Sequence, residues 1–320
     1  MRAAVVEKYG PPEVVVIREV PKPVPGDDDV LIKIHATTVN SGDARVRALR
    51  VPAGLSLLMR LALGFSGPKR KILGFDGAGA VEAVGKNVRG FKPGDRVVAS
   101  NGFKYGGHAE YFVVPESGGI AIIPQGISYT DAVSVPFGGA TALAFLRLGG
   151  LKAGESILIN GASGAVGTMA IQMAKNMGGV VTAVCSGKNA ELVRSLGADH
   201  VIDYAREDFT KGAATYDLIM DNHGNAPFPK IKHLLKPGGR FLMVILANLR
   251  EMLRRHPANL TVKGDSDAIN AETYGTLMDM LSKGIIQPVI DSTYTLDQIV
   301  EAYRRVDTGH KVGSVVVTVA

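Results

Sequence analysis

A strand-to-helix corner built on three glycines is the feature of this sequence that most restricts its fold. Residues 156–178 read SILINGASGAVGTMAIQMAKNMG, an apolar run, a loop containing Gly161, Gly164 and Gly167, and then a segment of helical period. Such a corner exposes the first unpaired N–H groups of the helix and the positive end of its dipole, which suit an anion. The corner contains no Asp or Glu. In this strand–turn–helix context it predicts a dinucleotide site.

The spacing of the corner argues against two other classes of site. Ala162 occupies the first glycine position of G-x-G-x-x-G, and no Gly-Lys-Ser/Thr follows, as a P-loop requires. A methyltransferase is a rival enzyme class, because LLKPGGRFLMV also occurs in such enzymes. Their glycine loop usually follows an acidic residue in the strand, and SILIN has none. Close helix packing remains the alternative explanation of Gly164 and Gly167.

Apolar runs alternate with helical segments from about Tyr129 onward. The expected strands are SILIN, VVTAVC, HVIDY, YDLIMDN and RFLMVIL, and the expected helices between them are AVGTMAIQMAKNMG, NAELVRSLG and FPKIKHLLKPGG. Short apolar strands joined by helix-length crossovers are typical of a parallel sheet covered on both faces. We therefore predict an α/β nucleotide-binding domain over residues 125–265.

The first 124 residues have a different pattern, with short extended runs separated by Pro, Gly and Asp clusters. In VLIKIHA, residues Val30, Ile32, Ile34 and Ala36 fall on one face. Several such strands predict an antiparallel barrel or sandwich. The last part of the chain, after about residue 265, contains two helical segments and an alternating strand, GSVVVTV, which is free to return to this domain.

Composition and charge narrow the class of protein. The net charge is +6, but the basic clusters, at residues 69–71 and 250–256, are not interleaved with aromatic residues, so we expect no nucleic-acid partner. The single cysteine, Cys185, excludes an intrachain disulfide and lies in an apolar run, where we expect a small buried side chain. With no signal-peptide core and no 18-residue apolar span, we expect a soluble cytoplasmic protein without an integral membrane segment.

The end of the second parallel strand indicates which nucleotide is bound. NAD enzymes typically place an acidic residue there to bind the ribose hydroxyls. This chain reads VCSGKNAE, with Ser186 and Lys188 at that point. A hydroxyl and an ammonium group suit a 2′-phosphate, so the sequence favours NADPH over NADH. The alternative is that Ser186-Gly187 is only a turn and that Lys188 caps it.

Four stretches together resemble a known family. NGASGAVG, RSLGADHVIDY, ILGFDGAGAVEAVG and GHKVGSVVV are similar to the zinc-independent quinone oxidoreductase branch of the medium-chain dehydrogenases/reductases, over nearly the whole chain. The resemblance implies an α/β protein with a GroES-like β-barrel catalytic domain, residues 1–124 and 266–320, and a Rossmann-type parallel-sheet domain that binds NADPH. It also implies an active-site cleft between them. We further expect a homodimer.

The resemblance also implies roles for individual residues. Asn40 and Thr141 are expected at the nicotinamide end, and Asn222, Ile245 and Leu246 at the other face of the cofactor. Backbone groups of Ser163, Gly164, Ala165 and Val166 are expected at the pyrophosphate, and Ser186, Lys188 and Tyr204 at the 2′-phosphate. Asn40, Asp43 and His223 are the candidate catalytic groups. Asp43 follows Asn40 on an expected surface turn, where simple solvation is the alternative, and His223 follows Asn222 directly. Two of these residues have a structural alternative. The Thr141 hydroxyl could bond only to its own helix backbone, and Tyr204 could serve only in packing.

The sequence departs from zinc-dependent relatives at the metal site. Their catalytic cysteine would fall near Asn40, and their His-Glu pair near Phe75-Asp76. We therefore predict that no metal is bound, because zinc prefers His and Cys ligands. Without a Lewis acid, hydride transfer to a quinone or an α,β-unsaturated carbonyl is easier than alcohol oxidation. A small hydrophobic carbonyl or quinone is thus the expected substrate, and a non-catalytic NADPH-binding redox sensor is the rival function.

An apolar, basic segment at residues 49–71 has two explanations. It ends in Lys69, Arg70 and Lys71. We expect a flap over the cleft, which would suit a bulky acceptor, and a membrane-surface helix is the alternative.

Overall fold

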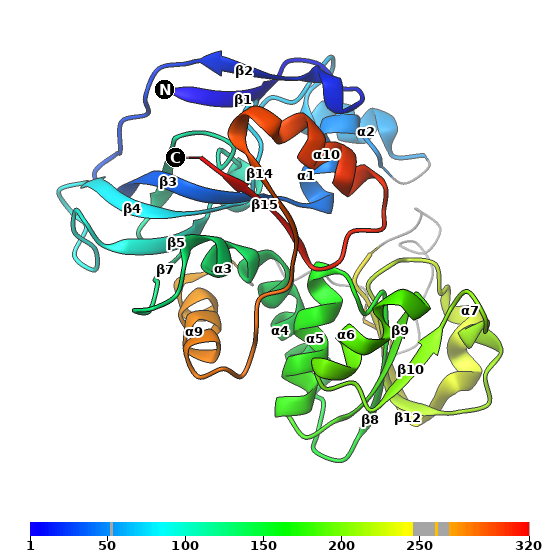
Figure 1. Cartoon of the computed structure of the whole chain (residues 1–320). Coiled ribbons are helices and arrows are strands. Elements are labelled where there is room, and N and C mark those ends of the chain that lie inside the picture. Colours follow the sequence, from blue (N-terminus) through cyan, green and yellow to red (C-terminus); the bar gives the residue numbers. More distant parts are fainter. Residues whose placement is uncertain (52–53, 246–259, 262–268, 320) are drawn as a thin grey trace.

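Two sheets organise the chain in the computed structural model, which describes residues 1–51, 54–245, 260–261 and 269–319 (Figure 1). One sheet is wholly parallel and the other mainly antiparallel. Figure 1 shows them in separate halves of the molecule, with α-helices between and around them. The sequence predicts this division into two sheet types.

The parallel sheet has the strand order β10-β9-β8-β11-β12-β13. Its strands are β8 (Ser156–Asn160), β9 (Val180–Cys185), β10 (His200–Asp203), β11 (Tyr216–Asp221), β12 (Leu235–Met243) and β13 (Leu260–Thr261). The order reverses direction between β8 and β11, and the crevice at the carboxyl ends of such strands is where open α/β sheets bind ligands. The glycine corner follows β8 directly, so it lies at this crevice.

Helices cover both faces of the parallel sheet. They are α4 (Pro136–Gly149), α5 (Ala165–Asn176), α6 (Ala190–Ser195) and α7 (Phe228–Ile231). Within β8, Ile157 and Ile159 pack into the same core as α4 and α5, whereas Leu158 packs with Ile231 and Phe241 on the opposite face. Burial on both faces explains why these strands are apolar throughout.

One predicted helix of this half is mostly wrong. FPKIKHLLKPGG forms only α7 and a 3-10 turn at Lys232–Leu234, and β12 already begins at Leu235. Pro237 supplies no N–H for a helix, and Gly238 has a positive φ of 75°. A helix could not continue through these two residues, and the chain is already extended at Leu235.

The second sheet has the order β14-β15-β3-β4-β5-β7, with β6 paired to β3. Its strands are β3 (Asp29–Val39), β4 (Asp76–Val84), β5 (Arg96–Ser100), β6 (Tyr111–Pro115), β7 (Gly119–Ile122), β14 (Ile290–Thr295) and β15 (Ser314–Thr318); β1 (Arg2–Val6) and β2 (Val15–Glu19) form a separate hairpin. The C-terminal strand β15 pairs antiparallel with β3, so the tail does return to the first half of the chain (Figure 1). The boundary expected at residues 265–266 lies outside the described residues.

The remaining helices are α1 (Ser41–Ala48), α2 (Ser56–Leu63), α3 (Tyr129–Ser134), α9 (Ala271–Ser282) and α10 (Ile299–Asp307). The segment after Asn40, expected to be a turn, is therefore the helix α1. Its capping box explains the difference: the Asn40 side chain accepts from the Asp43 N–H, and the Asp43 side chain accepts from the Asn40 N–H.

A buried ion pair joins α1 to α10. The Arg47 side chain is 0% exposed, its Nη2 donates to Asp307 Oδ2 at 2.7 Å, and its guanidinium lies 5.0 Å from the centre of the Tyr303 ring. Arg50 pairs with the same carboxylate at 2.9 Å, but its side chain is 53% exposed. The two arginines thus differ mainly in burial.

This difference predicts unequal effects of two matched substitutions. Arg47→Ala should lower the free energy of unfolding by about 3 kcal/mol, because it leaves a cavity and weakens a buried charge pair. Arg50→Ala should lower it by less than about 1 kcal/mol, because exposed pairs are screened. Urea denaturation measures both, and equal effects would show that burial does not decide the contribution.

Candidate active site

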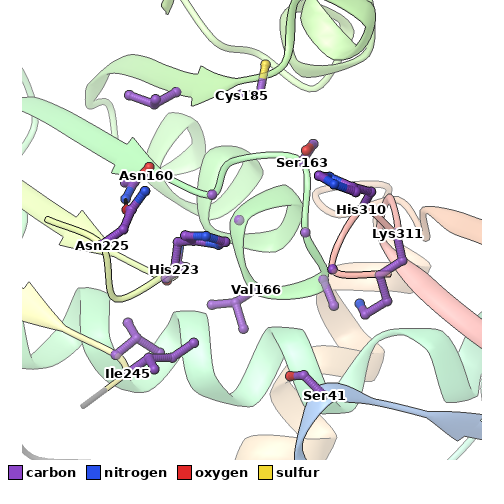
Figure 2. A pocket seen from close by; sticks show the side chains of 18 of the residues that line it. Ser41, Asn160, Ser163, Val166, Cys185, His223, Asn225, Ile245, His310 and Lys311 are labelled. Atoms are coloured by element: carbon purple, nitrogen blue, oxygen red, sulfur yellow. Dashed lines mark hydrogen bonds between the residues drawn. The ribbon is translucent and has the colours of Figure 1, made fainter. Parts of the chain in front are cut away.

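A cavity of about 650 Å³ lies where the carboxyl edge of the parallel sheet meets α1, α4 and the C-terminal tail (Figure 2). The glycine corner forms one wall. The helix α4 contributes Phe137, Thr141, Ala144 and Phe145, which recur at the spacing of one helix face. Both halves of the chain therefore contribute to one cavity.

Each glycine of the corner meets a different steric demand. Gly161 has a positive φ of 73°, which glycine adopts without strain. A Cβ at Gly167 would overlap the Gly161 carbonyl oxygen, so close packing explains this residue. A Cβ at Gly164 would have only the Gly161 oxygen nearby, at 3.5 Å, and Gly164 lines the cavity. The packing explanation thus holds for Gly167, while Gly164 leaves the start of α5 open to a ligand.

The loop residues expected at the pyrophosphate all line the cavity; they are Ser163, Gly164, Ala165 and Val166. Gly164 is the N-cap of α5, so the N–H groups of the following residues have no partner within the helix. Ser163 Oγ accepts from Asn189 Nδ2 at 3.1 Å, which ties the loop to the segment after β9. The wall is a fixed helix N-terminus suited to an anion.

The residues expected at a 2′-phosphate also lie together. Ser186, Lys188 and Tyr204 line the cavity after β9 and β10. Lys188 is exposed and forms no ion pair with the residues that the structure describes. Tyr204 is 52% exposed, which argues against a role in packing alone.

On the opposite wall, Asn222 and Ile245 line the cavity, and Leu246 lies outside the described residues. The side-chain amide oxygen and nitrogen of Asn222 are buried and have no hydrogen-bond partner in the described part of the chain. Asp221 fixes the neighbouring loop by accepting from the N–H groups of His223, Gly224 and Ala226. A buried side-chain amide without hydrogen-bond partners lowers the stability of the fold unless a ligand supplies those partners.

Thr141 and His223 also line the cavity. Thr141 Oγ1 donates to the Phe137 carbonyl at 3.0 Å, which is the expected bond to its own helix backbone. The same side chain also lines the cavity. His223 is exposed and directed into the cavity in Figure 2. Both side chains are available to a ligand.

The structure does not bring Asn40 and Asp43 to the cavity lining. Asp43 is 0% exposed, and its two carboxylate oxygens accept from the N–H groups of Asn40 and Gly74. Burial raises the pKa of Asp43 to about 8. The capping box of α1 turns both side chains toward the protein interior, so the geometry does not support the catalytic role expected for Asp43. Their neighbours Ser41 and Arg45 line the cavity instead.

Several lining residues were not anticipated. His310 and Lys311 come from the tail, Asn160 from the end of β8, and Asn225 from the loop after β11. Lys311 Nζ donates to the Gly313 carbonyl at 2.6 Å, and burial lowers the pKa of this lysine to about 8. Figure 2 shows His310 and Lys311 beside the glycine loop. Because these two residues lie far from the glycine loop in the sequence, no local pattern predicts that they line the same cavity. The stretch GHKVGSVVV, which contains both, does belong to the family pattern.

Charge in the cavity has one sign. Arg45, Lys188 and Lys311 lie along it, and the lining contains no Asp or Glu among the described residues. Cys185 also lines it, but burial raises the pKa of this thiol to about 11, so the thiol stays protonated. Three cations and a helix N-terminus suit a ligand with several negative charges.

The described residues do not fit a zinc site. Among them no group of three His, Cys, Asp or Glu side chains could hold a metal ion. Asp76, at the position where zinc-dependent relatives have a ligand, is buried and its Oδ1 accepts from the Tyr274 hydroxyl at 2.9 Å. Histidine and cysteine, the preferred zinc ligands, are missing at Asn40 and Phe75.

Comparisons with known proteins agree with this architecture. The alcohol dehydrogenase GroES-like domain family matches residues 26–125, and the zinc-binding dehydrogenase family matches residues 196–317. The mitochondrial NAD(P)H oxidoreductase RTN4IP1 of Bos taurus is 32% identical, over 100% of this chain and 89% of the relative. The 2-methylene-furan-3-one reductase of Solanum lycopersicum is 33% identical, over 91% and 72%.

A solved structure is similar throughout. The quinone oxidoreductase of Coxiella burnetii has a TM-score of 0.85 and 28% identity, with 100% of this chain and 99% of that chain covered. The GroES-like domain, the Rossmann-like sheet and the cavity between them define an oxidoreductase of two-domain type. The chain belongs to the medium-chain dehydrogenase/reductase superfamily, in its quinone oxidoreductase branch.

A buried carboxyl beside the site gives a pH-dependent prediction. Burial raises the pKa of Asp76 to about 7. From about pH 4 to pH 7 the unfolded state releases this proton while the folded state keeps it, so stability falls with pH. Asp76→Asn keeps an acceptor for Tyr274 and removes the ionisation. The unfolding free energy of the wild type should therefore fall, relative to the variant, by about 1.4 kcal/mol per pH unit in this window and level off above it.

Denaturant titrations of both proteins from pH 4 to pH 8 measure this difference. The titration of His108 is common to both proteins and largely cancels. Asp43, whose pKa of about 8 is raised by burial and in part by the Asp76 charge, keeps its proton in both proteins over most of this window. A difference that does not change with pH would show that Asp76 is ionised throughout.

Proposed function

We propose that this protein is an NADPH-dependent reductase of quinones or α,β-unsaturated carbonyls that works without zinc. The observation that carries the proposal is the cavity itself, which joins the open N-terminus of α5 to Lys188 and contains no carboxylate among its described residues. Relatives named as a quinone oxidoreductase and a 2-methylene-furan-3-one reductase support this substrate class.

The residues present fit NADPH. The N–H groups at Ala165 and Val166 would bind the pyrophosphate, and Ser186, Lys188 and Tyr204 the 2′-phosphate. The Asn222 side-chain amide, which has no partner in the described part of the chain, would bind the other face of the cofactor together with Ile245. Thr141 would line the nicotinamide end. Bound NADPH supplies a hydride.

The chain's own contribution is positioning and charge stabilisation. Phe137, Phe145 and Val306 give the cavity an apolar surface for the ring or chain of an acceptor. Arg45 and His223 are the polar groups available to a carbonyl oxygen that gains negative charge. We do not assign proton donation to Asp43, since its oxygens accept backbone N–H bonds outside the cavity lining. Water is the alternative donor. The homodimer and the cytoplasmic location stay predictions.

The activity is tested by following NADPH oxidation with a panel of quinones and linear enones, before and after treatment with a metal chelator. At least one acceptor should support steady turnover that the chelator leaves unchanged. Loss of activity on metal removal, restored by zinc, would contradict the zinc-independent proposal. Tight NADPH binding without turnover across the whole panel would instead support the non-catalytic redox sensor.

Lys188→Ala tests the choice of cofactor. A charge-assisted hydrogen bond contributes on the order of 1.5–3 kcal/mol, so the dissociation constant for NADPH should rise roughly ten- to a hundredfold. NADH lacks the phosphate, and its affinity should barely change. Lys230→Ala is the matched control, because Lys230 is also exposed but does not line the cavity. If Lys188→Ala weakens both cofactors equally, Lys188 is structural and the selectivity argument fails.

A further inference from the structure

The helix α2 and its flanking segment, residues 49–71, expose an apolar face. Leu57, Leu58 and Leu61 are 64%, 60% and 62% exposed, and Phe65, just after the helix, is 69% exposed. The three leucines occupy positions i, i+1 and i+4, which share one side of a helix. Large apolar side chains gathered in this way mark an interaction surface.

The structure orients this face outward. On the inner side, the Tyr9 hydroxyl donates to the Gly64 carbonyl at 2.8 Å, and the Arg60 guanidinium lies 5.5 Å from the centre of the Tyr9 ring. Lys69 Nζ donates to the Leu61 carbonyl at 2.9 Å, which closes the C-terminal end of α2. Figure 1 shows α2 at the periphery of its domain. The helix is therefore held in place by its polar side and presents its leucines to the surroundings.

The charge of the segment is wholly positive. Residues 49–71 contain no Asp or Glu, and their cations are Arg50, Arg60, Lys69, Arg70 and Lys71. Lys69, Arg70 and Lys71 are exposed. The apolar face and the basic cluster thus follow one another on the same short stretch of chain.

The position of the segment does not support the flap that its sequence suggests. Of the described residues of this segment, 49–51 and 54–71, none lines the cavity between the two domains. A cover for the cavity would place its apolar side chains against the acceptor, whereas these leucines are exposed.

We propose that α2 and the Lys69–Lys71 cluster form a docking surface for an anionic lipid bilayer. The leucines and Phe65 insert at the boundary between headgroups and acyl chains, and the cations bind the lipid phosphates. The positive charge of the segment favours an anionic partner. In the described part of the chain, no helix has both the length and the apolar character to cross a bilayer, so the attachment is peripheral.

The test is sedimentation of the full chain with vesicles of phosphatidylcholine alone, or with about 30 mol% phosphatidylglycerol. The wild type should bind the anionic vesicles and bind the neutral ones much more weakly. Leu57→Gln/Leu58→Gln/Leu61→Gln should reduce the partition coefficient at least about tenfold. Arg70→Gln/Lys71→Gln should reduce it roughly thirtyfold, because each cation contributes about 1 kcal/mol near such a surface.

Matched controls remove similar groups elsewhere. The Val24→Gln/Leu148→Gln variant replaces two exposed apolar side chains, and the Lys230→Gln/Lys232→Gln variant removes two exposed cations. Both double variants should bind vesicles like the wild type. All variants should keep the NADPH affinity and soluble-acceptor activity of the wild type, which separates this proposal from the proposed function.

Three results would overturn the proposal. The first is a wild type that does not bind anionic vesicles, and the second is binding that the leucine substitutions leave unchanged. The third is concentration-dependent self-association, measured by light scattering, that the leucine substitutions abolish, since the face would then belong to a second copy of the chain.

Discussion

The backbone hydrogen bond from the Gly313 N–H to the Ser163 carbonyl, 2.9 Å long, joins the two halves of the molecule at the cavity. It belongs to a bridge between Gly164 and Gly313, and thus connects the glycine corner to the strand β15 that completes the other sheet. Gly313 has a positive φ of 66°, and a Cβ there would overlap the Val289 carbonyl oxygen. The contact therefore depends on glycine at position 313, and it joins two walls of the cavity.

This contact also concentrates positive charge. It brings Lys311 and His310 beside the N-terminus of α5, while Lys188 approaches from β9 and Arg45 from α1. Four separate parts of the chain thus supply positive or dipolar groups to one space without a carboxylate in its described lining. Assembling such groups without a ligand is unfavourable, and a polyanionic nucleotide removes that cost.

Much of the fold could be predicted from local patterns, because strand and helix periods reflect burial. The apolar strands β8, β9 and β11 and the alternating strand β3 form where their sequence patterns predict strands. The glycine corner, whose pattern indicates a ligand site, lines the cavity. Residues whose role depends on tertiary contacts were less predictable. Asp43 closes a capping box with Asn40 where the sequence predicts a turn, and it also accepts from the N–H of Gly74, far along the chain. Arg47 is buried because Asp307, far along the chain, pairs with it. Lys311 reaches the cavity only through the return of β15.

The most direct test of this account is the affinity of the Gly164→Ala variant for NADPH, measured by calorimetry together with its unfolding free energy. Gly164 has an extended backbone, with φ of −78° and ψ of 174°, and its added Cβ would meet no protein atom closer than 3.5 Å. The fold should therefore tolerate alanine with a loss of less than about 1 kcal/mol. Its methyl group would occupy the space where a pyrophosphate approaches the helix, so the affinity should fall at least about tenfold. Unchanged NADPH affinity in a stably folded variant would show that the nucleotide does not bind at the glycine corner.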